Sequence, residues 1–231
     1  MTSMVETLEL VEGWLRGRAI DLAMGAKPNE FGVFPETGRT IVNSPNPDSK
    51  WVVGTDGIGR PDGRFFTIGA VEISVGQGRE VTSWYQPMIF GDGQGYILMI
   101  EDEETGAILL RAKTEPGNLG LKVNGLDTRV LLSPPFQASQ ANMDTHGAKV
   151  PLIEFAKQIT AWEVASEDGG RFYEKCNFYG CASVNRPEID AQIASSPTPD
   201  DFIWVSRELL RELRRKGLVN GHLRSAMSLL A

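Results

Sequence analysis

Histidine and cysteine are scarce in this 231-residue chain, which contains two of each. Two histidines, His146 and His222, are too few for a histidine-rich metal centre. The spacing of Cys176 and Cys181 matches no zinc site. On one strand these cysteines would point to opposite faces, so we expect no disulfide between them. The chain also lacks a G-x-x-x-x-G-K-[ST] phosphate loop, a G-x-S-x-G elbow and an H-E-x-x-H motif. These absences exclude the commonest nucleotide-hydrolase, serine-hydrolase and metalloprotease signatures.

Long apolar runs and an excess of basic residues are also missing. No run approaches the roughly 20 apolar residues that span a bilayer, and the amino terminus lacks the pattern of a secretory signal. We therefore expect a cytoplasmic protein with no membrane partner. The formal net charge of −7 argues against nucleic acid as the main partner. It leaves room for a local basic pocket that binds one diphosphate.

The pattern of elements predicts one α+β domain over residues 1–231, with a largely antiparallel sheet and helices at both ends. Ser3 and Glu6 fit a capping box, and apolar residues then recur at helical spacing up to Leu15. Turn residues separate several strand-like runs, which we expect to pair as successive hairpins. The expected strands are Arg64–Val75, Val81–Phe90, Tyr96–Glu101, Ala107–Glu115 and Arg129–Leu132.

The carboxy-terminal part predicts a mixture of elements. Pro151 suits the first turn of a short helix over Pro151–Lys157. We expect a hairpin over Gly170–Val184 and then a loop over Arg186–Pro199. A last helix should begin near Asp200 or Asp201, carry an apolar stripe and end at Gly217; the stripe comprises Phe202, Val205, Leu209 and Leu213.

Three ionisable side chains at the end of one strand are the first sign of a binding site. Arg111, Lys113 and Glu115 alternate along the run that precedes Pro116-Gly117, so they share one strand face. Charged groups at a strand end beside a turn suit a cleft that holds an anion and moves a proton. An edge strand with a solvated charged face would show the same pattern.

The other candidate site residues give weaker signals when each is considered alone. His146 lies in a polar stretch and titrates near neutrality, although a lone loop histidine is often structural. Trp84, Gln86 and Met88 share a face of a strand that Pro87 confines to an edge or bulge. An aromatic ring beside an amide could stack a nucleobase, or could simply be a core tryptophan. Polar side chains suited to sugar hydroxyls, or to ordinary loops, are Ser133, Gln137, Ser139 and Asn142.

Together these segments resemble the nucleoside-diphospho-hexose 2,3-dehydratase family of deoxysugar biosynthesis. The most specific segment is Ala112-Lys113-Thr114-Glu115-Pro116-Gly117-Asn118, followed by Leu132-Ser133-Pro134-Pro135-Phe136-Gln137-Ala138-Ser139. Further matches keep their order along the chain: Gly63-Arg64-Phe65-Phe66, Trp84-Tyr85-Gln86-Pro87, His146, Gly170-Arg171-Phe172-Tyr173, Val219-Asn220 and Arg224-Ser225.

The resemblance implies a Nudix-hydrolase-like fold used without Nudix metal chemistry, and the chain has no G-x5-E-x7-R-E-x-x-E-E box. It also implies a nucleotide-linked 4-keto-6-deoxyhexose as substrate and removal of water across C2 and C3, with no cofactor. Catalytic roles then fall to His146 or Glu115 as base or acid, with Lys113 or Arg111 stabilising the oxyanion or binding the diphosphate. The substrate-binding residues implied are Arg64, Trp84, Gln86, Arg111, Asn118, Ser133, Gln137, Ser139, Asn142 and Tyr173.

Members of that family carry two such modules in one chain, whereas this sequence shows one. A homodimer would rebuild the two-module arrangement. The alternatives are a module that binds a nucleotide sugar, or a partner protein, without catalysis, and an enzyme that acts on a different keto substrate.

Overall fold

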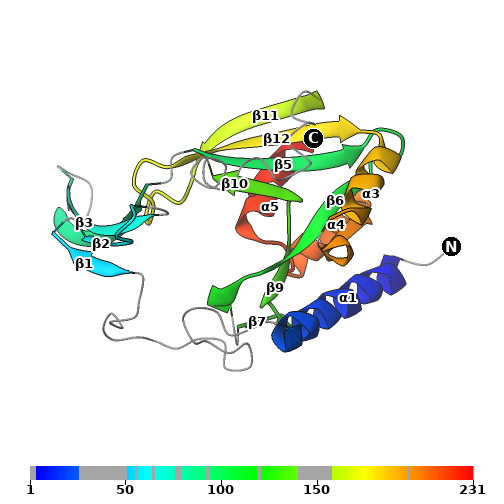
Figure 1. Ribbon diagram of the computed structural model, residues 1–231, viewed down its shortest axis with the longest axis horizontal. Helices are drawn as coiled ribbons and strands as arrows, with labels where there is room; N and C mark the ends of the chain where they lie inside the picture. Colours follow the sequence, from blue (N-terminus) through cyan, green and yellow to red (C-terminus); the bar gives the residue numbers. More distant parts are fainter. Residues whose placement is uncertain are drawn as a thin grey trace.

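The computed structural model describes residues 4–25, 51–55, 57–63, 66–75, 80–91, 94–118, 121–139, 158–196 and 198–230. These residues form a mixed α+β structure in which a small sheet stands beside a larger one packed with helices (Figure 1). The predicted α+β class and the predominance of antiparallel pairing are confirmed. The predicted Pro151–Lys157 helix lies outside the described residues.

The small sheet has four antiparallel strands in chain order. Its strands are β1 (Val52–Gly54), β2 (Gly57–Gly59), β3 (Thr67–Ser74) and β4 (Ser83–Phe90). β3 and β4 pair over their whole lengths, which confirms the predicted hairpin. β4 is an edge strand, as Pro87 requires, because proline has no amide hydrogen for a second neighbour.

The large sheet follows the order β11-β12-β5-β6-β13, with β10 paired to β5 and β9 to β6. Only β12 and β5 run parallel. The strands are β5 (Gly95–Asp102), β6 (Ile108–Thr114), β9 (Val130–Ser133), β10 (Phe136–Ser139), β11 (Ile159–Ser166), β12 (Cys176–Val184) and β13 (Phe202–Val205). A two-stranded ribbon, β7 (Lys122–Val123) with β8 (Leu126–Asp127), precedes β9.

β5 and β6 form the predicted hairpin, but they pair only beside its turn, at Ile100 with Leu109 and Glu101 with Ile108. Beyond these pairs they separate. β10 then takes the place beside β5, and β9 the place beside β6. Pro134-Pro135 joins β9 to β10 across the opening, so the sheet is split into two wings (Figure 1).

Helices cover both faces of the large sheet. α1 (Met4–Gly25), α4 (Arg207–Arg215) and α5 (Gly221–Ala226) pack on one core, whereas α3 (Arg186–Ala194) packs on the other through Ile189. Alternate strand residues supply the two cores: Ile97 and Met99 face the first, and Leu98 and Ile100 the second. The predicted amino-terminal helix is confirmed, and its Leu8, Val11 and Leu15 are buried. Single turns of 3-10 helix complete the chain: η1 (Pro116–Asn118), η3 (Pro199–Asp201) and η4 (Met227–Leu229).

Three carboxy-terminal predictions are wrong. Residues 176–184 form one strand that pairs with β11, so Gly170–Val184 is not a hairpin by itself. Arg186–Ala194 is a helix with proline in its first turn, not a loop. Phe202–Val205 is a strand, because Ile203 and Val205 pack on one core while Phe202 and Trp204 pack on the other. The last helix therefore begins at Arg207, and the side chain of Ser206 caps it by accepting from Leu209 N.

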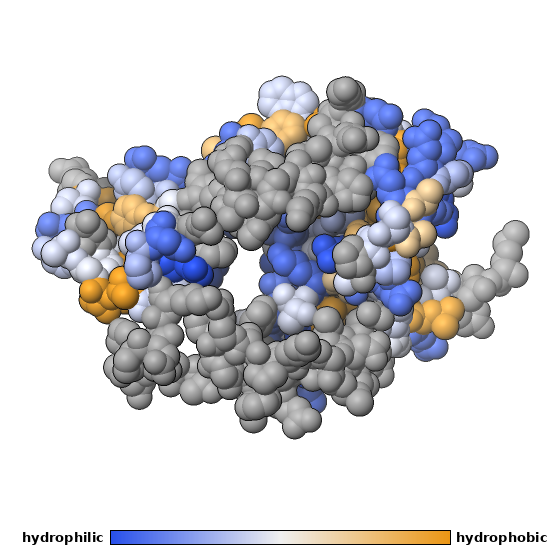
Figure 2. Space-filling view, viewed as in Figure 1, coloured by the Kyte–Doolittle hydropathy of each residue, from blue (hydrophilic) through white to orange (hydrophobic). Residues whose placement is uncertain are grey.

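Cys176 and Cys181 are both free, as predicted, and burial raises the pKa of Cys181 to about 11. None of the described helices is long and apolar enough to cross a membrane. On the face in Figure 2 hydrophilic surface gathers in the middle, and exposed apolar side chains occur over β1, where Val52 and Val53 lie, and over the start of α1.

Candidate functional site

A pocket of about 800 Å³ lies between the two wings of the large sheet. One wall comes from the end of β6 and from β9, and the opposite wall from β12 and the β11–β12 connection. The start of α5 closes the pocket between them. Its ionisable side chains are Lys113, Glu115, Glu167, Asp168, Arg171, Tyr179, His222 and Arg224. The split of the sheet therefore creates a cavity with several acidic and basic groups.

Glu115 lies just after β6, half-buried at the pocket wall. Its Oε1 accepts a hydrogen bond from Nδ2 of Asn220 at 3.1 Å. Asn220 is also the cap of α5, because its Oδ1 accepts from Leu223 N at 2.9 Å. Since Asn220 is only 5% exposed, both of its bonds are held in place. The start of α5 thus fixes the direction of the Glu115 carboxylate.

Lys113 extends from β6 into the pocket, and its Nζ donates to Gln137 Oε1 at 2.6 Å. Gln137 belongs to β10, so this bond joins the two wings across the split. Its Nε2 is buried and has no hydrogen-bond partner among the described residues. The two most specific segments of the sequence therefore meet at one side-chain contact.

Asp168 and Arg171 form the tight connection between β11 and β12. The Asp168 carboxylate accepts from Arg171 Nε at 2.6 Å and from Gly170 N at 3.1 Å. The Arg171 side chain, and then the Gly170 amide, lower the pKa of Asp168. The Arg171 side chain is 75% exposed, so the guanidinium hydrogens that do not face Asp168 remain open to a ligand at the pocket rim.

Tyr179, His222 and Glu167 lie in a row inside the pocket. Tyr179 Oη is 3.3 Å from His222 Nδ1, and His222 Nε2 is 3.7 Å from Glu167 Oε1. Burial lowers the pKa of His222, and the Glu167 carboxylate acts in the opposite direction. An imidazole between a hydroxyl and a carboxylate is placed to accept and return a proton.

Of three further predicted residues, two lie outside the pocket lining. Arg111 turns toward η3 and β13: its Nη2 donates to Thr198 Oγ1 at 3.3 Å and lies 3.7 Å from Asp201 Oδ2. Ser133 is buried, with its hydroxyl 3.1 Å from the carbonyl oxygen of Arg111. Asn118 does line the pocket, and its amide donates to Thr128 O at 3.2 Å. The side chains of Arg111 and Ser133 therefore bind other groups of the protein and do not face the pocket.

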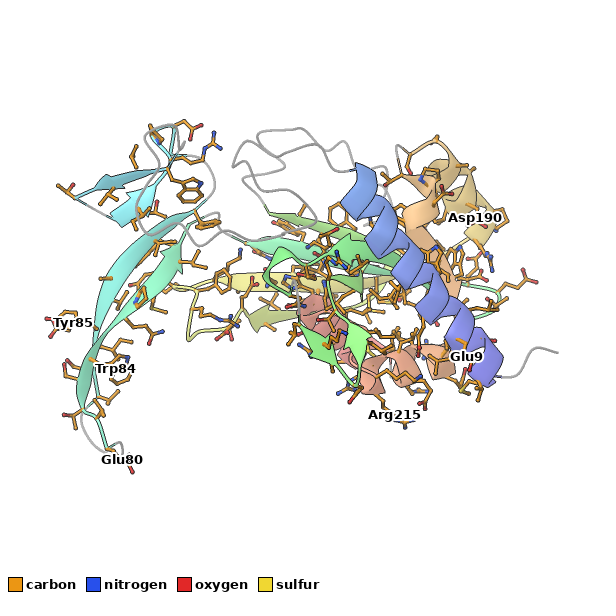
Figure 3. All side chains as sticks on the ribbon, turned by 90° about the horizontal axis from the view of Figure 1, so that it is seen from below. Glu9, Glu80, Trp84, Tyr85, Asp190 and Arg215 are labelled. Atoms are coloured by element: carbon orange, nitrogen blue, oxygen red, sulfur yellow. The ribbon has the colours of Figure 1, made fainter. Side chains whose placement is uncertain are left out.

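Three further predicted residues lie on or beside the small sheet. Trp84 lies on the outer part of the β3–β4 hairpin (Figure 3), and its indole donates to Gln86 Oε1 at 3.1 Å. The Gln86 amide in turn donates to Gly170 O. Tyr173 stacks on Phe90 with ring centroids 4.7 Å apart. These residues attach the small sheet to the pocket wall at 168–173.

The remaining predicted residues are less fully described. Ser139 pairs with Gly95 at the end of β10. Arg64, Asn142 and His146 lie outside the described residues, so their predicted roles stay predictions. Within the described part of the chain, no three side chains of His, Cys, Asp or Glu come close enough to share a metal ion.

Sequence reasoning missed several pocket residues, although some belong to segments that carried the resemblance. Arg171, Asn220 and Arg224 stand in such segments and converge here from distant parts of the chain. His222 lies between two of them, and its position between Asn220 and Arg224 was a usable signal. Tyr179 and Glu167 carried no sequence signal, because only the folding of β11 onto β12 brings them to His222.

Comparison with known proteins identifies relatives of this chain. A family model described as NDP-hexose 2,3-dehydratase matches residues 45–230. A dTDP-4-dehydro-6-deoxy-alpha-D-glucopyranose 2,3-dehydratase from Streptomyces violaceoruber is 29% identical over 174 residues, covering 72% of this chain and 36% of its own length. Enzymes of the same name are 30% identical over 175 residues in Saccharopolyspora spinosa (72% and 33%) and 29% identical over 198 residues in Amycolatopsis orientalis (79% and 39%).

The chain therefore spans about a third of the length of these curated relatives. The matched region contains both sheets, the pocket and every element from β1 to α5. Because the family model covers most of the chain and includes all the residues of the pocket, the chain belongs to the NDP-hexose 2,3-dehydratase family.

Proposed function

We propose that this chain eliminates water across C2 and C3 of a nucleoside-diphospho-4-keto-6-deoxyhexose, with a thymidine-linked sugar as the first candidate. The observation that carries the proposal is that the Lys113–Asn118 segment lines the pocket together with Asn220 and Arg224. The named activity of the relatives supports the same reaction.

The reaction requires a base, a group that stabilises an enolate and an acid. The 4-keto group acidifies the proton on C3, and Glu115 is the candidate base because Asn220 directs its carboxylate. Lys113 is the candidate cation for the enolate oxygen, since Gln137 occupies only one of its three ammonium hydrogens. Arg171 and Arg224, both exposed at the pocket, suit the two phosphates of the nucleotide.

Incubation with thymidine-diphospho-4-keto-6-deoxyglucose and analysis of the sugar product test the proposal. Removing a general base typically costs about 10²–10⁴ in rate, so Glu115→Gln should lower kcat by that order. Lys113→Met should also lower kcat, whereas Lys122→Met, on the exposed ribbon outside the pocket, should not. Binding of the sugar nucleotide without any product would favour a non-catalytic module instead. His146→Ala tests the remaining predicted acid or base.

We also propose that the family relationship extends to a Nudix-like topology and to a homodimer, which would place two modules in one particle. Both remain predictions that follow from the resemblance. Sedimentation velocity on the purified chain tests the second: a single species of monomer mass at all concentrations would contradict it.

A further inference from the structure

We propose that Tyr179 is the proton donor to the leaving C2 hydroxyl, and that His222 and Glu167 restore its proton. The inference rests on the proposed dehydration in the same pocket. It assigns a catalytic role to a buried tyrosine and a positioning role to Glu167.

The charges and hydrogen-bonding capacities of the three groups favour one order of proton transfer along the row. The Glu167 carboxylate, whose Oε1 lies 3.7 Å from His222 Nε2, favours the tautomer with hydrogen on Nε2, because a negative charge attracts an N–H group and repels a ring lone pair. Nδ1 is then free to accept from the hydroxyl of Tyr179, 3.3 Å away. Donor, imidazole and carboxylate stand in the same order as the hydroxyl, imidazole and carboxylate of a serine-hydrolase triad.

Two side chains contact Oε2 of Glu167, the carboxylate oxygen that does not face His222. Asn177 Nδ2 donates to its Oε2 at 2.8 Å, and Lys175 Nζ lies 3.7 Å from the same oxygen. Asn177 is 2% exposed and packs against Gly95, where an added Cβ would lie 2.1 Å from the amide oxygen. This close packing prevents the amide from turning away, so Glu167 is held facing His222.

The charges around His222 are balanced. Glu167 and Glu115 favour its protonated form, whereas Lys113 and Lys175 disfavour it, and burial disfavours it most. An imidazole in this setting is neutral at rest and becomes charged only briefly. That property suits a group that passes protons rather than one that holds a fixed charge.

Atoms and charge are conserved through the elimination. Glu115 takes the C3 proton, and the electron pair of the broken C–H bond becomes the enolate and then the C2–C3 double bond. The C2–O bond breaks, and the departing hydroxide takes the Tyr179 proton and leaves as water. Glu115 returns its proton to solvent. His222 takes one from solvent, as an imidazolium beside Glu167, and passes it from Nδ1 to the Tyr179 phenolate.

Kinetics of Tyr179→Phe test the role of the hydroxyl. The variant should lose about 100-fold in kcat, the usual size of a general-acid contribution, with KM within about twofold of wild type. Tyr96→Phe is the matched control, because Tyr96 packs against Phe178 and does not line the pocket. A kcat of Tyr179→Phe within twofold of wild type would overturn the proposal.

A proton NMR titration of the chain's two histidines tests the row without any turnover. Glu167→Gln keeps the shape of the side chain but removes its charge, so the pKa of His222 should fall below its wild-type value. Glu163→Gln, on β11 just before the β11–β12 connection and bonded to Ser228, should leave it unchanged. His222→Ala identifies the resonance.

An equal pKa in wild type and Glu167→Gln would overturn the row even if the enzyme is active. A fall in pKa in a chain without dehydratase activity would support the row and place the failure in the proposed reaction.

Discussion

Gly95 begins β5 at a position where a larger residue cannot be accommodated. A Cβ there would lie 2.1 Å from Asn177 Oδ1, and the buried Asn177 amide can move only by losing Glu167. We expect Gly95→Ala to destabilise the fold by about 1–3 kcal/mol, the usual cost of overpacking. Urea denaturation measures this. Gly13→Ala is the control, because a Cβ at this exposed helix position meets nothing and should stabilise by about 0.5–1 kcal/mol. Equal midpoints for Gly95→Ala and wild type would contradict the packing argument.

His222 also links stability to pH. Its folded pKa lies below the unfolded value of 6.5, chiefly through burial, so the unfolded chain binds more protons as the pH falls below 6.5. The stability that His222 contributes is therefore present above 6.5 and is lost as the pH falls toward the folded pKa. We expect the unfolding free energy of wild type to fall more steeply from pH 7 to pH 5 than that of His222→Gln. Parallel curves for the two proteins would contradict this assignment.

The residue scale is where the sequence was least predictive. Alternation along β6 correctly predicted that Arg111 and Lys113 share a face, yet one contacts Thr198 and the other Gln137. Alternation along a strand shows on which face of the sheet each side chain lies. Which neighbouring residue that side chain contacts depends on the order of the strands. The pairing of β6 with both β13 and β9 decides that order, and no local pattern contains it.

At the scale of elements, β4 and the 168–173 connection act as one unit. Ile89 N donates to Arg171 O at 2.7 Å, and Tyr173 N donates to Ile89 O at 2.9 Å. The Gln86 amide adds a side-chain bond to Gly170 O. The edge strand therefore holds the loop that presents Asp168 and Arg171 to the pocket.

Removing the Gln86 amide should loosen this unit. We expect Gln86→Leu to speed hydrogen exchange at the Tyr173 amide and to weaken thymidine diphosphate binding, because Arg171 loses its fixed position. Tyr85→Leu is the control on the opposite face of β4, where Tyr85 is 74% exposed (Figure 3). Unchanged exchange and unchanged affinity in Gln86→Leu would show that the side-chain bond does not hold the loop.

Elements with a clear period were predicted well, and those set by tertiary packing were not. The amino-terminal helix and the β3–β4 and β5–β6 hairpins follow from periodicity and turn residues. Phe202 and Val205 fit a helical stripe, but both faces of the 202–205 run pack against a core, and only a strand places alternate residues against two cores. The sequence also could not predict that β12 lies parallel to β5, because their pairing joins segments about 80 residues apart.

At the scale of the whole molecule, the pocket exists because two wings of one sheet and the start of α5 meet around it. A ligand that fills the pocket contacts both wings of the sheet and the start of α5, and it binds only the folded state. Its binding must therefore raise the stability of the entire structure. Two of the segments found in the sequence, Lys113–Asn118 and Val219–Asn220, converge at this pocket, whereas Trp84 and Ser133 do not line it.

Thermal unfolding with thymidine diphosphate tests this coupling. At a free concentration of 100 times Kd, binding should add about 2.7 kcal/mol, which for a chain of this size raises Tm by roughly 5–10 °C. Arg171→Ala and Arg224→Ala should each reduce the shift, since both guanidinium groups stand at the pocket. Arg211→Ala should preserve it, because this arginine lies on α4, exposed beside Glu208 and outside the pocket lining. A full shift in both pocket variants would place the nucleotide elsewhere, and the absence of any shift in wild type at millimolar ligand would contradict nucleotide binding by this chain.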